Sequence, residues 1–335
     1  MEIRNLLKYR QYWMGIAMLW IVFFHASISC SGALSWIKTI GYGGVDIFLF
    51  ASGIGNYSSY LRDRDPLAFL KRRIQRLAPV YIPFIIIWLT YKLVMDTSFL
   101  KYTVGNFFAI QGFTSNGGEF NWYLTGILIC YILTPYLAQF VSEHSTKQTA
   151  LMILGLLLIS VAFWNDKRLI ISITRLPIYT IGMLFKKHED KVLYIKSKLL
   201  LVITFLAGSA VLFIAYRCFR QLLWNYGLHW YPFILITPGL CMIISFVISA
   251  IENKHWTSVL FRPILSFLAL VGKSSFETYL IHIFAFDILA GINAKHPLSH
   301  KSLTYACVGL CAILFAIAVN YTITQVQKKK TRATN

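Results

Sequence analysis

Residues 198–216 have the sequence KLLLVITFLAGSAVLFIAY, in which the only charged side chain is Lys198 at the start. A helix that spans the hydrocarbon core of a bilayer needs about 20 mostly apolar residues, which is the length of this block. An open strand cannot cross lipid, because its backbone polar groups would stay unpaired. The block therefore predicts a transmembrane helix.

Comparable blocks recur along the 335-residue chain, which is 57% hydrophobic and only 13% charged. Soluble domains carry about 25% charged residues, so this composition excludes disorder and disfavours an ordinary water-soluble enzyme. We predict an all-α, polytopic transmembrane helix bundle of about ten spans. The candidate spans are 12–29, 40–60, 77–95, 120–141, 149–164, 169–185, 198–216, 231–251, 264–289 and 303–324.

The charge of the chain is strongly positive, at +19, but the Lys and Arg side chains lie between the apolar blocks. That placement favours a lipid bilayer over nucleic acid as the partner. Most basic residues fall on the side of the two termini, which predicts that both termini are cytoplasmic. We expect one membrane domain over residues 1–327, a short basic tail over 328–335, and a multi-pass location in the inner (plasma) membrane of the cell.

Two polar residues, His25 and Asp46, lie inside the first two predicted spans. Ionisable groups at such positions are costly and usually face a functional site. A short hairpin would place both near the outer surface, where a carboxylate could orient a basic imidazole, as in a catalytic triad. The alternative is that His25 is a satisfied interior histidine and Asp46 caps the second helix.

Arg73 and Arg76 stand three residues apart at the predicted cytoplasmic entrance of the third span. This spacing places them on one helix face, and guanidinium groups bind phosphates through two parallel hydrogen bonds. A polyphosphate ligand is one interpretation, and topogenic charge that contacts anionic lipid is the other.

The six cysteines form no CxxC pattern, so no metal site is predicted.

Further polar side chains occur in the later spans. Arg175 would lie near the depth of His25 and Asp46, where it would pair with Asp46, meet an anionic group, or snorkel to the interface. In the block 264–289, Tyr279 and His282 share a helical face. This face is either part of a site or a polar seam that holds helices together.

In this order the motifs resemble the acyltransferase-3 family of integral membrane acyltransferases, and the resemblance covers nearly the whole chain. The segments that carry it are Phe23–Ala26, Gly44–Gly53, Arg73–Pro79, Trp122–Leu124 with Pro135, Arg175–Gly182 and Gly272–His282.

The resemblance implies transfer of an acyl group, usually acetyl, from cytoplasmic acyl-CoA to a sugar hydroxyl of an envelope polysaccharide or lipid-linked glycan. It implies acetyl-CoA as a substrate and no permanently bound cofactor. By the same resemblance His25 is the catalytic base or transient acyl carrier. The residues themselves also suggest a base at His25, with Asp46 as the carboxylate that orients it. The resemblance further implies that Arg73 and Arg76 bind the donor. Trp122, Arg175, Tyr279 and His282 become pocket residues.

The chain departs from the family pattern at two positions. Many members carry an arginine where this chain has Met14, and a glutamate where it has Ile127. Two other functions stay open at this point: a transporter or flippase for a glycan or small solute, and a non-catalytic membrane subunit.

Overall fold

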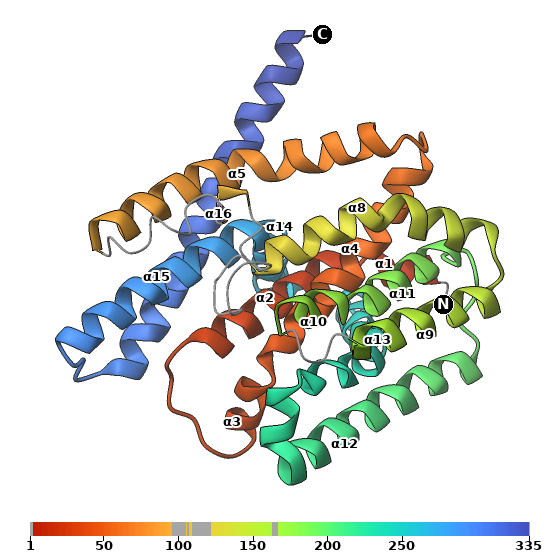
Figure 1. The fold of residues 1–335 in the computed structure, drawn as a ribbon, viewed down its shortest axis with the longest axis horizontal. Helices are drawn as coiled ribbons and strands as arrows, with labels where there is room; N and C mark the ends of the chain where they lie inside the picture. The colour runs from red at the N-terminus through yellow and green to blue at the C-terminus, as the bar shows by residue number, and fades with distance from the viewer. Residues whose placement is uncertain (1–2, 96–104, 106, 109–121, 163–166, 335) are drawn as a thin grey trace. The chain divides into compact units, whose positions relative to one another are not determined.

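The structure is a computed structural model that describes residues 3–95, 105, 107–108, 122–162 and 167–334 (Figure 1). These residues are almost entirely helical and contain no β-strand, so the predicted all-α class is confirmed. The principal helices are α1 (Ile3–Leu7), α2 (Arg10–His25), α3 (Gly32–Thr39), α4 (Gly44–Leu61), α5 (Pro66–Met95), α8 (Trp122–Glu143), α9 (Thr146–Ala162), α10 (Lys167–Ile173), α11 (Leu176–Lys187), α12 (Ile195–Asn225), α13 (Pro232–Asn253), α14 (His255–Lys273), α15 (Ser275–Lys295) and α16 (Lys301–Thr334). The short 3₁₀ helices are η1 (Gly41–Gly43) and η3 (Leu228–Trp230).

Six helices of the described part are long and apolar enough to cross a membrane. A seventh span is reached if α3 and the helix after it, which meet at a bend of 43°, are counted together. The ten spans expected from the sequence are therefore not all recovered, and the orientation of the termini stays a prediction. The six helices are Pro66–Met95, Trp122–Glu143, Ile195–Asn225, Leu228–Asn253, Ser275–Lys295 and Lys301–Lys329.

Two apolar blocks that the sequence presents as single spans are broken helices. The block 264–289 is divided between α14 and α15 at Ser274, whose hydroxyl bonds to the Leu270 carbonyl at 3.0 Å. The block 169–185 is divided between α10 and α11 at Thr174, whose hydroxyl bonds to the Ile170 carbonyl at 2.7 Å. Such side-chain bonds compete with the backbone ladder, and Pro177 further removes a backbone donor.

The chain forms two compact units. The first contains the described residues within 1–9, 46–78 and 89–249, and the second contains the described residues within 10–45, 79–88 and 250–335. The single domain predicted for residues 1–327 is not tested by this division. Residues 328–334 of the predicted basic tail continue α16.

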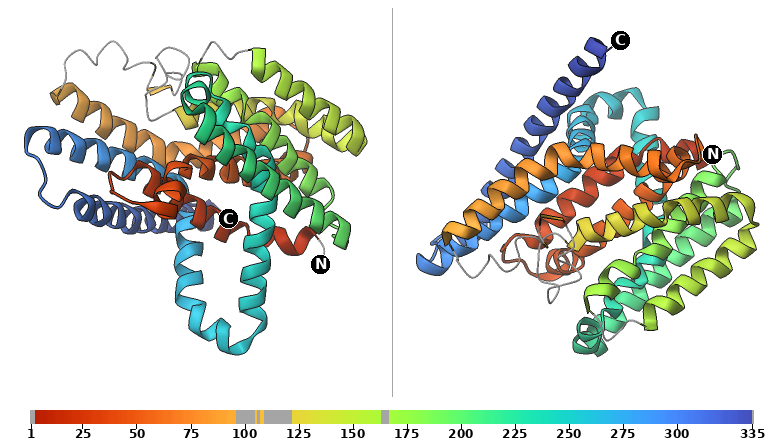
Figure 2. Two further views of the ribbon diagram at one scale, coloured as in Figure 1. Left: turned by 90° about the horizontal axis from the view of Figure 1, so that it is seen from below. Right: turned by 45° about the horizontal axis from the view of Figure 1, so that its top comes forward.

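In the second unit, α2 packs closely against α14, and α15 lies beside α16 (Figures 1 and 2). Gly15 of α2 faces the Leu268 backbone, while Gly272 of α14 faces the Gln11 backbone. Because glycine has no side chain, the two helices approach to backbone contact. The pair α15 and α16 is joined by a hydrogen bond of 2.8 Å from Asn320 Nδ2 to Glu277 Oε1.

In the first unit, α4 crosses α11 with the same kind of backbone contact, between Gly53 and Tyr179 and between Gly182 and Phe50. The buried Tyr179 hydroxyl lies 2.5 Å from Thr134 Oγ1 and accepts a 2.8 Å hydrogen bond from Asn56 Nδ2. One phenol therefore links α4, α8 and α11 around a polar centre within the core.

The close crossing makes Gly182 intolerant of a side chain. A Cβ at this position would lie within 3.0 Å of the Phe50 backbone, which has no flexible end that could move aside. We expect Gly182→Ala to destabilise the protein by about 1 to 3 kcal/mol, the usual effect of overpacking. Thermal unfolding of the purified protein in detergent measures the change.

Gly155 of α9 is the matched control, because an added Cβ there meets nothing within 4 Å. Gly155→Ala is expected to leave stability unchanged or raise it slightly, since alanine favours helix over glycine by about 1 kcal/mol. Equal melting temperatures for the two variants would contradict the predicted crossing.

Candidate active site

Two histidines from distant parts of the sequence meet in the second unit. His25 is the last residue of α2, and its Nδ1 lies 3.1 Å from Nε2 of His282 on α15. His25 is exposed, whereas His282 is fully buried. One edge of the His25 ring therefore rests on the interior of the unit, and the rest of the ring is accessible.

The buried ring of His282 is held on several sides. Its Nδ1 lies 2.7 Å from the carbonyl oxygen of Thr278, one turn earlier in α15. The rings of Tyr279 and Phe286 contact it edge-on, with centroids at 6.0 and 5.8 Å. Tyr279 and His282, which the sequence assigns to one helical face, therefore lie together.

Other groups near the end of α2 also interact with the His25 ring or with the chain that follows it. Phe24 contacts the His25 ring edge-on, with centroids 5.0 Å apart, and Lys38 of α3 interacts with the imidazole electrostatically. Four residues beyond His25, the Ser29 N–H donates to Ser302 Oγ at 3.1 Å. This bond anchors the chain leaving α2 to the start of α16.

Asp46 and Arg175 form an ion pair in the first unit. Arg175 Nη1 bonds to Asp46 Oδ2, and the two side chains are 2% and 1% exposed. The guanidinium carbon of Arg175 also lies 5.3 Å from the centroid of the Trp230 ring, a cation–π contact. The pairing of Arg175 with Asp46, one of the sequence-based alternatives, is confirmed.

The ion pair alters the expectation for Asp46. The sequence suggested a hydrogen bond between Asp46 and His25, but the observed partner of Asp46 Oδ2 is Arg175, and the observed partner of His25 Nδ1 is His282. Asp46 lies in the first turn of α4, where the helix dipole favours a negative charge. Its catalytic role stays a prediction.

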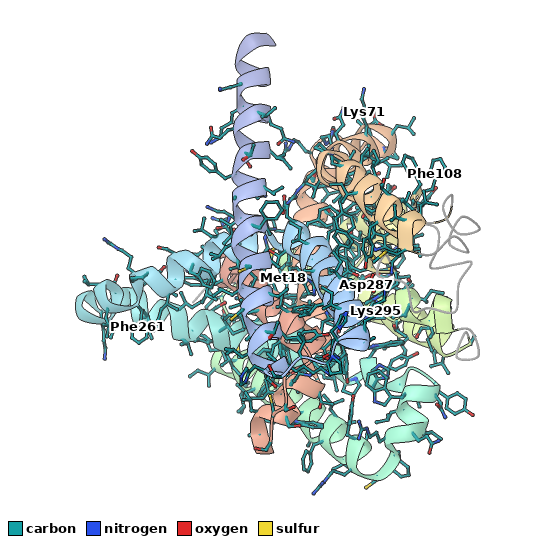
Figure 3. All side chains as sticks on the ribbon, turned by 90° about the vertical axis from the view of Figure 1, so that its left-hand side faces the viewer. Met18, Lys71, Phe108, Phe261, Asp287 and Lys295 are labelled. Carbon is teal, nitrogen blue, oxygen red and sulfur yellow. The ribbon has the colours of Figure 1, made fainter. Side chains whose placement is uncertain are left out.

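The arginines on the basic face of α5 differ in whether they are paired with a carboxylate. Arg72 donates to both carboxylate oxygens of Asp63, at 2.5 and 3.2 Å, and to the Ser59 carbonyl at 3.2 Å. The hydrogen bond from Arg72 holds the pKa of Asp63 below its usual value. Lys71 projects from the helix into the surroundings (Figure 3).

Arg73 and Arg76 have no carboxylate partner among the residues that the structure describes. Arg73 stacks over the Phe69 ring at 5.0 Å, and its buried Nε makes no hydrogen bond within this part of the chain. Arg73 and Arg76 both interact electrostatically with the Tyr131 hydroxyl, and Arg76 interacts with that of Tyr123. These two guanidinium groups are thus available to a ligand.

Trp122 begins α8, with its ring centroid 6.2 Å from that of Tyr123. Ile127 on the same helix is buried, so the glutamate of the family pattern is replaced by a core residue. Tyr123, which belongs to the Trp122–Leu124 motif but received no role there, and Tyr131, which the sequence reasoning missed, are further functional candidates. Their spacing of eight residues, about two helical turns, is the signal that places them on one face of α8.

Apolar helices of spanning length, with charged and imidazole groups buried between them, define a polytopic membrane protein. An acyltransferase domain family, Acyl_transf_3, matches residues 12–324. The chain belongs to this acyltransferase-3 family, as its motifs indicated. No curated protein and no solved structure gave a significant match.

Proposed function

We propose that this membrane protein transfers an acyl group, in the first place acetyl, from cytoplasmic acyl-CoA to a sugar hydroxyl. The acceptor is an envelope polysaccharide or a lipid-linked glycan at the inner membrane. The observation that supports the proposal is the contact between the exposed imidazole of His25 and the buried ring of His282. The chain that carries this pair belongs to an acyltransferase family.

The chemistry assigns one role to His25. Its imidazole takes the proton of the acceptor hydroxyl while the oxygen attacks the thioester carbonyl. A carbon–oxygen bond forms, the carbon–sulfur bond breaks, and the proton passes to the departing CoA thiolate. The products are the O-acylated sugar and free CoA.

In this proposal Arg73 and Arg76 bind the phosphate groups of CoA. Within the part of the chain that the structure describes, their guanidinium groups are not paired with carboxylates, in contrast to the neighbouring Arg72. Charge-assisted hydrogen bonds from arginine to phosphate are about twice as strong as neutral ones. Trp122, at the start of the same α8 that carries Tyr131, is proposed as a pocket residue.

The donor site predicts a binding defect. The double variant Arg73→Gln, Arg76→Gln is expected to raise KM for acetyl-CoA by roughly 10²- to 10⁴-fold, because two charge-assisted bonds worth about 1.5 to 3 kcal/mol each are lost. The kcat value should change little, since the phosphates are remote from the reacting bond. Steady-state kinetics in proteoliposomes measures both constants.

Lys71→Gln is the matched control, because Lys71 is an exposed cation on the same helix. It removes a charge near the same membrane surface and should leave KM for acetyl-CoA within about twofold, given the small value of exposed charge pairs. Equal KM increases in the control and the double variant would indicate a diffuse electrostatic effect instead of a site.

The proposed function itself is tested with acetyl-CoA labelled in the acetyl group. The purified protein, mixed with a glycan-bearing membrane extract, should transfer label to a hydroxyl and release CoA. Acetyl-CoA should also protect the protein against thermal unfolding, because a ligand that binds only the folded state stabilises it. Neither transfer nor protection is expected of a glycan transporter, and that result would refute the proposal.

A further inference from the structure

We infer that His282 is a positioning residue that selects the tautomer of His25 and leaves the His25 Nε2 lone pair on the accessible side. This inference rests on the proposed function, in which His25 is the base. From the sequence, His282 belongs either to a polar seam between helices or, by the family resemblance, to a substrate pocket, whereas the structure buries it completely beside His25.

The tautomer of His282 follows from its contact with Thr278. A carbonyl oxygen can only accept a hydrogen bond, so His282 Nδ1, 2.7 Å away, must carry the proton. In a neutral imidazole the other nitrogen is then an acceptor. Full burial beside the Tyr279 and Phe286 rings favours the neutral form, since an isolated buried charge is costly.

The tautomer of His25 follows in turn. Its Nδ1 faces the His282 Nε2 lone pair at 3.1 Å, and two bare nitrogens cannot bond to each other. His25 Nδ1 therefore donates, and its Nε2 keeps the lone pair.

This chain of bonds, from His25 through His282 to the Thr278 carbonyl, performs the orienting task that a carboxylate performs in a catalytic triad. Among the described residues, the groups that face His25 electrostatically are His282 of α15 and Lys38 of α3. Glu277, the nearest carboxylate in the sequence of α15, is bonded to Asn320. The neutral His282 ring thus takes the place of the carboxylate that orients the histidine in a catalytic triad.

Two amide variants test the positioning role. In His282→Gln the side-chain oxygen reaches the place of ring Nε2 and can accept from His25. In His282→Asn the amide reaches only the place of ring Nδ1, so the bond to Thr278 is kept and the acceptor for His25 is lost. Both variants are neutral and polar.

We expect His282→Gln to retain kcat within about tenfold, and His282→Asn to lower kcat by roughly a further 10- to 100-fold, by analogy with the loss of the partner that orients a metal-bound histidine. KM for acetyl-CoA should stay unchanged in both. Equal kcat values in the two variants would overturn the inference, and because His282→Asn also leaves the larger cavity, a tautomer measurement separates the positioning role from lost packing.

A second measurement does not depend on activity. In protein labelled with ¹⁵N at histidine, the His25 signals, assigned by their loss in His25→Ala, should show a protonated Nδ1 and an unprotonated Nε2 at neutral pH. His282→Asn should shift His25 toward a mixture of tautomers, and His282→Gln should not. A wild-type His25 protonated at Nε2 overturns the inference, whereas the expected tautomer in a protein without transfer activity refutes only the proposed function.

Discussion

His25→Ala is expected to lower the rate of acyl transfer by about 10²- to 10⁴-fold, the contribution of a positioned general base. The variant should fold normally, because His25 is exposed at the last position of α2 and packs only one edge against His282. The rate of label transfer from acetyl-CoA at saturating donor concentration measures the effect.

The control for this variant is His296→Ala. His296 follows α15 in the same unit, fourteen residues beyond His282, and is also exposed. This substitution should leave the rate within about twofold, as expected of a surface position. Full activity in His25→Ala would remove His25 from the mechanism, and label retained on wild-type His25 without an acceptor would identify it as the acyl carrier instead of the base.

The second large effect is expected for Asp46→Leu, which should lower the free energy of unfolding by about 3 to 5 kcal/mol. The substitution leaves Arg175 as an uncompensated cation in a site where both side chains are nearly inaccessible to solvent. Thermal unfolding in detergent and the folded fraction after membrane extraction would both report this loss.

Removing the partner as well should restore much of that stability. The double variant Asp46→Leu, Arg175→Met replaces the pair by apolar groups, which is often neutral for buried ion pairs. Equal destabilisation of the single and double variants would show that the two charges are not coupled. A stable Asp46→Asn protein that has lost acyl transfer would instead support the catalytic role predicted for Asp46 from the sequence.

The buried ionisable residues of the site could be predicted from the sequence. The residue that each one contacts could be predicted only in part. A charge within an apolar block is visible locally, so Asp46 and Arg175 were recognisable as buried groups, and their equal predicted depth suggested the pair. For His25, depth alone suggested Asp46. His282, which the sequence placed on a polar face with Tyr279, is the partner that the structure shows, because α2 ends against α15.

The apolar run lengths, the distribution of Lys and Arg, and the order of the motifs by themselves determined the membrane class and the acyltransferase family. These are local quantities, since burial in lipid depends on the composition of each segment. Tertiary structure alone decided that α14 and α15 are separate at Ser274, that Arg72 is committed to Asp63 while Arg73 is not, and which nitrogen of His25 faces His282. Those outcomes depend on how each helix is rotated and how closely its glycines let it approach a neighbour, and neither quantity is encoded in one segment.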